Sequence, residues 1–169
     1  MNHPKRACGR LISGSGLKSS SCEESIDLRG GDYERGRGLF FGERVKCGTC
    51  HRLRGEGGAI GPDLSNLAHR DAASVRRDIQ DPNAMINPDY VAYSVRLRDG
   101  NELTGFVRSQ SGDSLRVVGS DGKEKVVRRA DLTELRPSAV SLMPTGLLEG
   151  LKDTDLTDLM TFLLHEPPF

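Results

Sequence analysis

The chain has no tryptophan, few aromatic residues and no excess of charge of either sign. Aromatic residues make up 5% of its 169 residues, and 24 Lys and Arg residues balance 24 Asp and Glu residues. Balanced charge gives no overall field that would attract nucleic acid, and few rings are available to stack on bases. We therefore expect no nucleic-acid partner.

The sequence also lacks long hydrophobic runs. No stretch approaches the ~20 apolar residues of a membrane-spanning helix, so we expect no transmembrane segment. The N-terminus is positively charged but has no apolar run of about 7–15 residues, which a signal peptide needs. Residues 1–30 are instead rich in Ser and Gly and predict a flexible N-terminal arm. Cys8 and Cys22 lie in this arm, and whether they pair stays open.

Two cysteines and a histidine lie close together in the stretch KCGTCHRL, at Cys47, Cys50 and His51. The spacing C-x-x-C-H is that of c-type haem attachment. Two thiols can form thioethers with the two vinyl groups on one edge of a porphyrin, and the imidazole that follows can bind the iron. The sequence therefore predicts one covalent haem c, attached to Cys47 and Cys50, with His51 as an iron ligand.

Two other kinds of site use a C-x-x-C pair. A thioredoxin-type redox dithiol expects a βαβ context, which the surrounding sequence does not show. A zinc site needs a second Cys or His pair at a suitable spacing, and Cys8, Cys22 and His69 do not form one. Haem attachment is the favoured interpretation.

Helical patterns lie on both sides of this motif. DYERGRGLFFGERVKCGTC, residues 32–50, predicts one helix that runs into the motif, and a second helix is expected near residues 71–80. DTDLTDLMTFLL, residues 153–164, has apolar residues at 3–4 spacing, and prolines follow it, so it predicts a C-terminal helix.

The order G-x-x-L-F, C-x-x-C-H, G-P-D-L and Met-Pro before a C-terminal helix resembles a class I cytochrome c. In that family the first and last helices cross, with a glycine of one against an aromatic residue of the other. The resemblance implies that Gly36 and Phe40 face Phe162. It also implies that the carbonyl of Pro62 accepts a hydrogen bond from Nδ1 of His51.

A narrower resemblance covers residues 33–164. GEGGAIGPDLSNLAHR, DPNAMINPDY and RPSAVSLMPTGL resemble the haem-binding domain of planctomycete and verrucomicrobial proteins, which often ends larger membrane-bound dehydrogenase-like chains. The resemblance implies a redox partner protein, such as a dehydrogenase or an oxidase. Because haem is attached to C-x-x-C-H outside the cytoplasm, a periplasmic or otherwise extracytoplasmic location is expected, although no signal peptide is visible.

The second axial iron ligand is predicted to be Met143. It lies about ten residues before the last helix, where a class I cytochrome c carries its methionine ligand. Met160 has the spacing of a core residue on that helix. Met85, His69 and His165 remain as alternatives.

The stretch from about residue 90 to 130 changes period. Apolar residues alternate with polar ones, and turns are indicated at Asp99–Gly100, Ser111–Gly112 and Asp121–Gly122. We expect four short antiparallel strands that form a curled sheet or a small barrel, inserted into a cytochrome c domain of residues 31–169. The predicted fold is thus a mainly α cytochrome c fold with a β insertion, α+β overall. The insertion has two open roles, to cover the haem and brace the Met143 loop, or to dock a redox partner.

These features predict an electron carrier and not an enzyme, because an iron with two protein ligands has no free site for oxygen or peroxide. The alternative is a haem-based sensor or a peroxidase-like protein with an open distal site. A dithiol or zinc module without haem is the third possibility.

Overall fold

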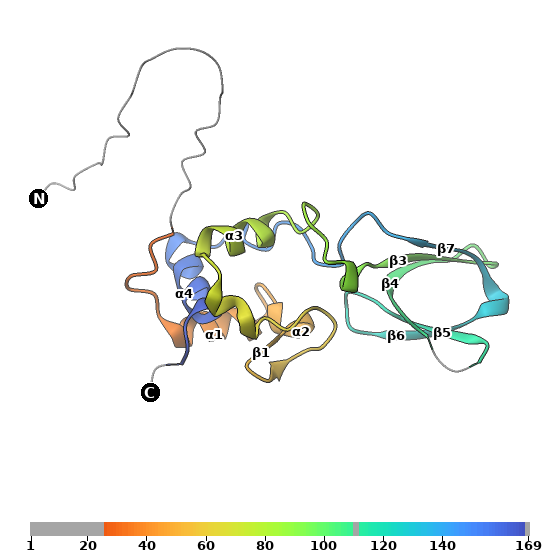
Figure 1. Ribbon diagram of the computed structural model, residues 1–169, viewed down its shortest axis with the longest axis horizontal. Coiled ribbons are helices and arrows are strands. Elements are labelled where there is room, and N and C mark those ends of the chain that lie inside the picture. The colour runs from red at the N-terminus through yellow and green to blue at the C-terminus, as the bar shows by residue number, and fades with distance from the viewer. Residues whose placement is uncertain (1–25, 110–111, 168–169) are drawn as a thin grey trace, which may run out of the picture.

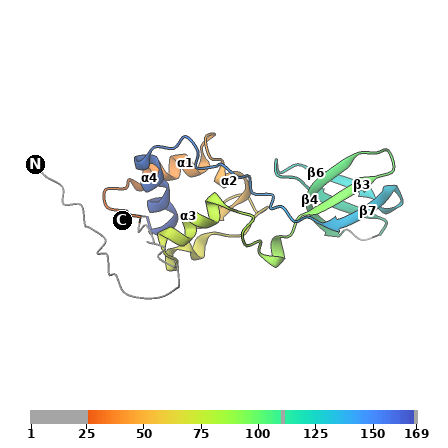
Figure 2. The same cartoon turned by 90° about the horizontal axis from the view of Figure 1, so that it is seen from above.

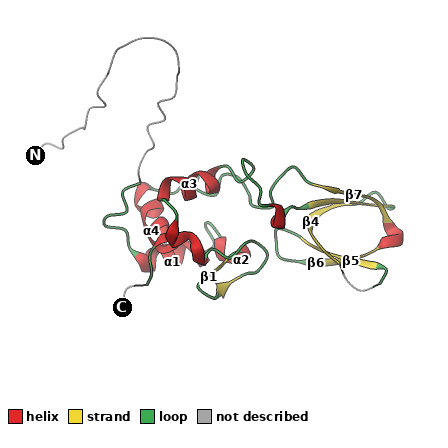
Figure 3. Ribbon diagram, viewed as in Figure 1, coloured by secondary structure: helices red, strands yellow, loops and turns green. Residues whose placement is uncertain are grey.

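The computed structural model describes residues 26–109 and 112–167. Helices gather at one end of the molecule and a larger β-sheet lies at the other (Figure 1, Figure 3). The elements in chain order are α1 (Tyr33–Phe41), α2 (Cys47–Cys50), β1 (Arg52–Leu53), β2 (Glu56–Gly57), η1 (Ser65–His69), α3 (Ala72–Gln80), η2 (Pro88–Tyr90), β3 (Tyr93–Leu97), β4 (Glu102–Ser109), β5 (Ser114–Val118), β6 (Glu124–Arg128), η3 (Arg129–Asp131), β7 (Leu132–Pro137) and α4 (Asp153–Leu164).

The first and last long helices, α1 and α4, pack across one another, as the resemblance implies (Figure 2). A Cβ atom on Gly36 would lie 2.8 Å from Cβ of Phe162 and closer still to the carbonyl oxygen of Asp158. The ring of Phe162 lies 5.4 Å from that of Phe40 and 5.0 Å from that of Tyr33. The glycine thus removes the side chain that would hold the two helices apart, and the rings fill the space beside it.

A buried carboxylate also joins these two helices. Asp158 of α4 has a side chain only 4% exposed, and it accepts hydrogen bonds from Nε of Arg35 at 2.7 Å and from the backbone N–H of Asp32 at 2.6 Å. The side chain of Asp32 caps α1 by accepting from the N–H of Arg35. The carboxylate of Asp158 therefore accepts a hydrogen bond from the backbone at the start of α1 and forms an ion pair with Arg35, one turn later in the same helix.

The prediction of one helix over residues 32–50 is wrong. The helix α1 ends at Phe41, and the short helix α2 begins at Cys47 after a turn. Lys46, which precedes α2, has a left-handed backbone with φ of 53°. The turn redirects the chain, so the cysteines lie on a separate helix. The helices expected near 71–80 and over 153–164 are confirmed as α3 and α4.

The larger sheet has five antiparallel strands in the order β6-β5-β4-β3-β7, one more than we expected. The additional strand is β7, which pairs with β3 and extends the sheet beyond residue 130 to Pro137. Its sequence, LTELRP, is mostly exposed, so little apolar alternation marks it. No strand pairing within the described residues joins β6 to β7, so the structure shows an open sheet and not a closed barrel.

The helical part and the sheet have separate apolar cores. One core is built on Phe40, Leu159, Met160 and Phe162, and the other on the sheet residues Val95, Val117 and Val127. The two ends of the sheet insertion meet, because the N–H of Ser138 donates to the carbonyl of Ala92 at 2.8 Å. The sheet is therefore a self-contained unit within the helical fold.

Residues 1–25 lie outside the described residues. The predicted flexible arm, which contains Cys8 and Cys22, falls mostly in this segment, and so does the region in which we expected no signal peptide. Just after them, Ile26 and Leu28 pack against the helical core. Among the described residues, no helix is both long enough and apolar enough to span a bilayer.

Candidate functional site

The two predicted attachment cysteines lie on α2, a helix of one turn. Cys47 packs against the helical core, and the thiol of Cys50 points toward the sheet, where it donates to the carbonyl oxygen of Ser120 at 3.7 Å. Both thiols are free. Burial raises the pKa of Cys47 to about 11, and burial also raises the pKa of Cys50. Both side chains are therefore held as S–H near neutral pH.

The imidazole of His51 has a defined orientation. Its Nδ1 lies 2.9 Å from the carbonyl oxygen of Pro62, which is the contact that the resemblance implies. Because a carbonyl only accepts hydrogen bonds, Nδ1 carries the proton, and the neutral ring keeps its lone pair on Nε2. Burial lowers the pKa of His51, and the hydrogen bond to Pro62 opposes this in part. The ring is thus favoured in the neutral form, which is the form that binds a metal.

The loop after the motif folds back onto it and supports this orientation. The N–H groups of Ile60 and Gly61 both donate to the carbonyl of Cys50, at 3.0 and 2.8 Å. A Cβ on Gly61 would lie 2.7 Å from Cε1 and 2.9 Å from Nδ1 of His51. Only a residue without a side chain fits against the imidazole here, so Gly61 lets the backbone bring Pro62 to Nδ1.

The donor set fits a c-type haem. Two unpaired thiols three residues apart and an imidazole with a free Nε2 are the groups that covalent attachment and axial ligation need. A redox dithiol would need a thiol of lowered pKa, whereas both are raised. For zinc, more ligands would have to join the two cysteines, and the described part of the chain has no group of three or more His, Cys, Asp or Glu placed to hold a metal.

The candidates for the second axial ligand differ in their surroundings. Met143 is half-buried in the segment between β7 and α4, where its N–H donates to Oγ of Ser141. Met85 is 89% exposed, and Met160 is fully buried in the helical core, as expected for a packing residue. His69 and His165 are exposed at helix ends.

The sheet reaches the motif through the turn between β5 and β6. Besides the contact of Ser120 with Cys50, a Cβ on Gly122 would lie 3.2 Å from Cδ1 of Ile60. From β4, Nη2 of Arg108 donates to the carbonyl of Ala59 at 3.3 Å. Sequence reasoning identified the Asp121–Gly122 turn but missed these contacts, because no local pattern shows which distant segment a turn will meet.

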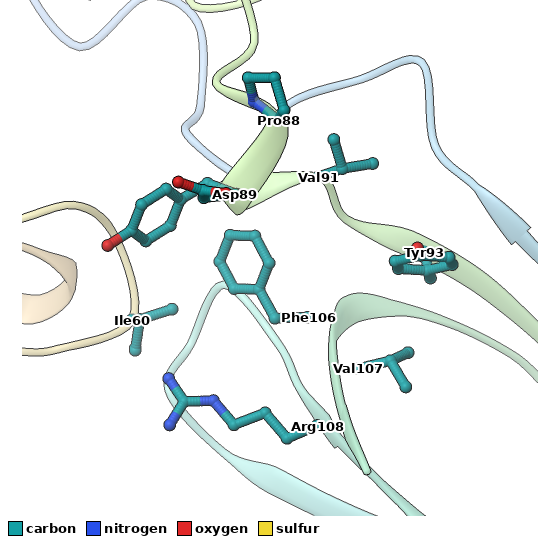
Figure 4. A pocket seen from close by; sticks show the side chains of 9 residues that line it. Ile60, Pro88, Asp89, Val91, Tyr93, Phe106, Val107 and Arg108 are labelled. Carbon is teal, nitrogen blue, oxygen red and sulfur yellow. The ribbon is translucent and has the colours of Figure 1, made fainter.

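A pocket of about 250 Å³ lies where the loop after the motif faces the sheet (Figure 4). The rings of Tyr90 and Phe106 meet edge to face with centroids 6.0 Å apart, and Ile60 of the motif loop lines the same pocket. The residues that line it are Ile60, Pro88, Asp89, Tyr90, Val91, Tyr93, Phe106, Val107 and Arg108. This pocket was not predicted, because its lining comes from the motif loop, η2, β3 and β4, which are separate in the sequence.

Comparison with known proteins supports the same interpretation. Residues 33–103 match the model of the cytochrome c family, which supports a cytochrome c haem-binding domain in this part of the chain. The matched segment includes Cys47, Cys50, His51 and Pro62 and ends before Met143. No curated protein matches the chain.

Proposed function

We propose that this protein is a c-type cytochrome that carries one covalent haem and transfers single electrons between redox partners. The observation that carries the proposal is the geometry of the C-x-x-C-H segment: two free thiols on one turn of helix, followed by an imidazole whose Nδ1 is held by Pro62 and whose Nε2 is left for iron. The cytochrome c family match supports it.

Attachment uses the two thiols. The S–H groups of Cys47 and Cys50 would each add across one vinyl double bond of the haem, with sulfur bonding to one carbon and hydrogen to the other, so the two residues would hold it without a net change of oxidation state. When bound, the haem supplies an iron that cycles between the ferric and ferrous states by one electron. The chain itself contributes attachment at Cys47 and Cys50, ligation by His51 and exclusion of water, and it needs no general acid or base.

We further propose Met143 as the second axial ligand. It is half-buried in the segment that precedes α4, and the N–H of Ser141 in that segment donates to Oδ1 of Asn83 at 2.9 Å. This hydrogen bond ties the Met143 segment to the chain that follows α3. A methionine ligand would raise the reduction potential relative to a second histidine.

The sheet insertion is proposed to cover the haem edge next to Cys50. The turn between β5 and β6 lies against the Cys50 thiol, and the rings of Tyr90 and Phe106 line one pocket with Ile60 of the motif loop. A partner would then reach the haem beside the sheet or across it. The narrower resemblance supports a dehydrogenase or oxidase as that partner, and haem attachment to C-x-x-C-H, which takes place outside the cytoplasm, supports an extracytoplasmic location.

The test is a visible spectrum of the protein matured with a haem-attachment system, in the oxidised and reduced states. We expect haem that stays bound after denaturation and a weak far-red band in the oxidised protein, lost in Met143→Ala and kept in the matched control Met85→Ala. A five-coordinate wild type would favour a sensor or peroxidase-like protein. No bound haem would overturn the cytochrome proposal.

A further inference from the structure

The two edge strands of the larger sheet, β6 and β7, differ in how well their free edges are protected. β7 ends at Pro137, which has no N–H to donate, and its pairing with β3 shifts register between Arg96 and Leu97. Prolines and bulges are two of the devices that keep an edge strand from pairing with another chain. β6 has no proline, and its pairing with β5 keeps one register throughout. β6 is therefore the edge that is open to further pairing.

The backbone of β6 directs alternate residues toward its free edge. The carbonyl of Lys123, just before β6, and the N–H of Arg129, just after it, both bond to the β5 side. Because alternate residues of an antiparallel strand bond to the same neighbour, the three even-numbered residues between them direct their N–H and C=O groups away from β5. These residues are Glu124, Val126 and Arg128. No strand in the described part of the chain pairs with them.

The side chains of the same three residues lie on the outer side of the sheet. Val127 belongs to the buried sheet core, and side chains alternate between the two sides of a strand. Val126, its neighbour, is 64% exposed. On β5, the residues directly opposite Glu124 and Arg128 are an uncharged valine and a serine. An exposed apolar side chain thus lies between two opposite charges along a free edge.

The sequence of β6, EKVVR, is complementary to itself in an antiparallel pair. When Val126 lies opposite Val126 of a second copy, Glu124 lies opposite the second copy's Arg128 at both ends. Lys125 then lies opposite Val127, so this register places no two like charges directly opposite one another. Opposite charges and apolar side chains are favourable cross-strand neighbours, and they favour one register over its alternatives.

Both charged residues already have partners within the chain. Glu124 pairs with Arg116 at 2.9 Å, and Arg128 pairs with Asp131 at 2.8 Å. The side chains of Glu124 and Arg128 are 44% and 77% exposed in these pairs, and exposed ion pairs contribute little to stability. The side chains therefore remain accessible for a further contact across the edge.

We propose that β6 pairs edge to edge with β6 of a second copy of this chain, which joins the two sheets into one across a twofold axis. Main-chain hydrogen bonds would supply the affinity, and the charges of Glu124 and Arg128 would set the register. The inference goes beyond the proposed function and does not depend on haem. One short strand from each copy makes a small interface, so the dimer is expected to be weak and concentration-dependent.

The experiment is sedimentation equilibrium of the haem-loaded protein at low salt, where charge pairs are screened least. The average mass of the wild type should rise toward twice the monomer mass between roughly 10 µM and 1 mM protein. A monomer throughout this range would overturn the proposal. A mass that passes twice the monomer mass would also overturn it, because pairing of β6 with a different edge does not close and gives longer chains.

Charge reversal tests the register. Glu124→Arg places Arg opposite Arg at both ends, and Arg128→Glu places Glu opposite Glu, so each variant alone should dimerise about 10-fold more weakly or worse. An equal mixture of the two variants restores both opposite-charge pairs and should dimerise like the wild type. The double variant, with both changes in one chain, should also dimerise like the wild type.

Glu134→Arg on β7 is the matched control, since it reverses one charge of an exposed pair on the other edge strand and should leave dimerisation unchanged. Undiminished pairing in both single variants, or no recovery in the mixture and in the double variant, would overturn the proposal. So would a loss of pairing in Glu134→Arg as large as in Glu124→Arg. Haem content is measured separately on the same samples, so a failure of the cytochrome proposal is distinguished from a failure of the dimer.

Discussion

Gly36 of α1 lies directly against Phe162 of α4, with room for no Cβ atom between them. This contact sets how closely the two helices cross, and Phe40 next to it is fully buried against the same ring. The α1–α4 pair supports α2 and its cysteines, since Cys47 packs on the core that the pair forms. The geometry of the proposed attachment site therefore depends on this contact between the two helices.

Gly36→Ala should destabilise the fold by about 1–3 kcal/mol, because the added methyl group overlaps Asp158 and Phe162. Gly38→Ala is the matched control on the same helix, where nothing lies within 4 Å of the added atom. There alanine should stabilise the helix by up to about 1 kcal/mol through its higher helix propensity. Urea unfolding of the haem-loaded proteins measures both, and equal effects at the two positions would contradict the packing argument.

Asp158→Asn should lower stability at pH 7 by about 1–3 kcal/mol, because it weakens the pairing with Arg35. Hydrogen bonds from Arg35, and one from the N–H of Asp32, lower the pKa of Asp158 below its ordinary value, although burial opposes this. A lowered folded-state pKa stabilises the fold above the unfolded-state pKa of about 3.9, and this stabilisation is lost as the pH falls through the folded value.

The difference in unfolding free energy between wild type and Asp158→Asn should therefore be larger at pH 7 than at pH 3, as measured by urea unfolding at both pH values. Asp78→Asn, which removes an exposed pair with Arg70, is the control and should change stability little. A difference that grows on acidification would show that the carboxylate charge of Asp158 does not stabilise the fold.

Gly61→Ala should weaken iron ligation by His51. The added methyl group would press on Cε1 and Nδ1 of the ring and disturb the hydrogen bond to Pro62. Loss of such an outer contact typically costs about 10–100-fold in metal affinity. Because protons compete with iron for Nε2, acid should displace His51 at a pH roughly 1–2 units higher, as followed by the visible spectrum. Ala59→Ser, at an exposed position, should titrate like the wild type.

Replacing residues 93–137 with two glycines should keep the helical fold and the covalent haem. The ends to be joined, Ala92 and Ser138, already share a hydrogen bond, and the helical core contains no residue of the sheet. The reduction potential should fall, because water reaches the haem edge beside Cys50 and stabilises the ferric charge. Redox titration against the full chain measures this change. An unchanged potential would show that the sheet does not cover the haem.

The sequence was most informative where the chemistry is local. Cys47, Cys50 and His51 lie within five residues, so the spacing alone indicated their function. The helices α3 and α4 followed from periodicity, because the residues on one side of a helix recur in a short window. The resemblance supplied two longer-range contacts that the structure contains, Gly36 with Phe162 and His51 with Pro62.

Only the tertiary structure determined the remaining features. The break between α1 and α2 depends on the packing of Cys47 and on a left-handed residue, Lys46, that no propensity would place there. The contact of Ser120 with Cys50 joins residues 70 positions apart. Such contacts depend on how whole elements pack, and a local sequence pattern shows only which residues share one side of one element. The sequence by itself determined the spacing of the two thiols and the imidazole, because these groups are neighbours in the chain, and the tertiary structure determined what surrounds them.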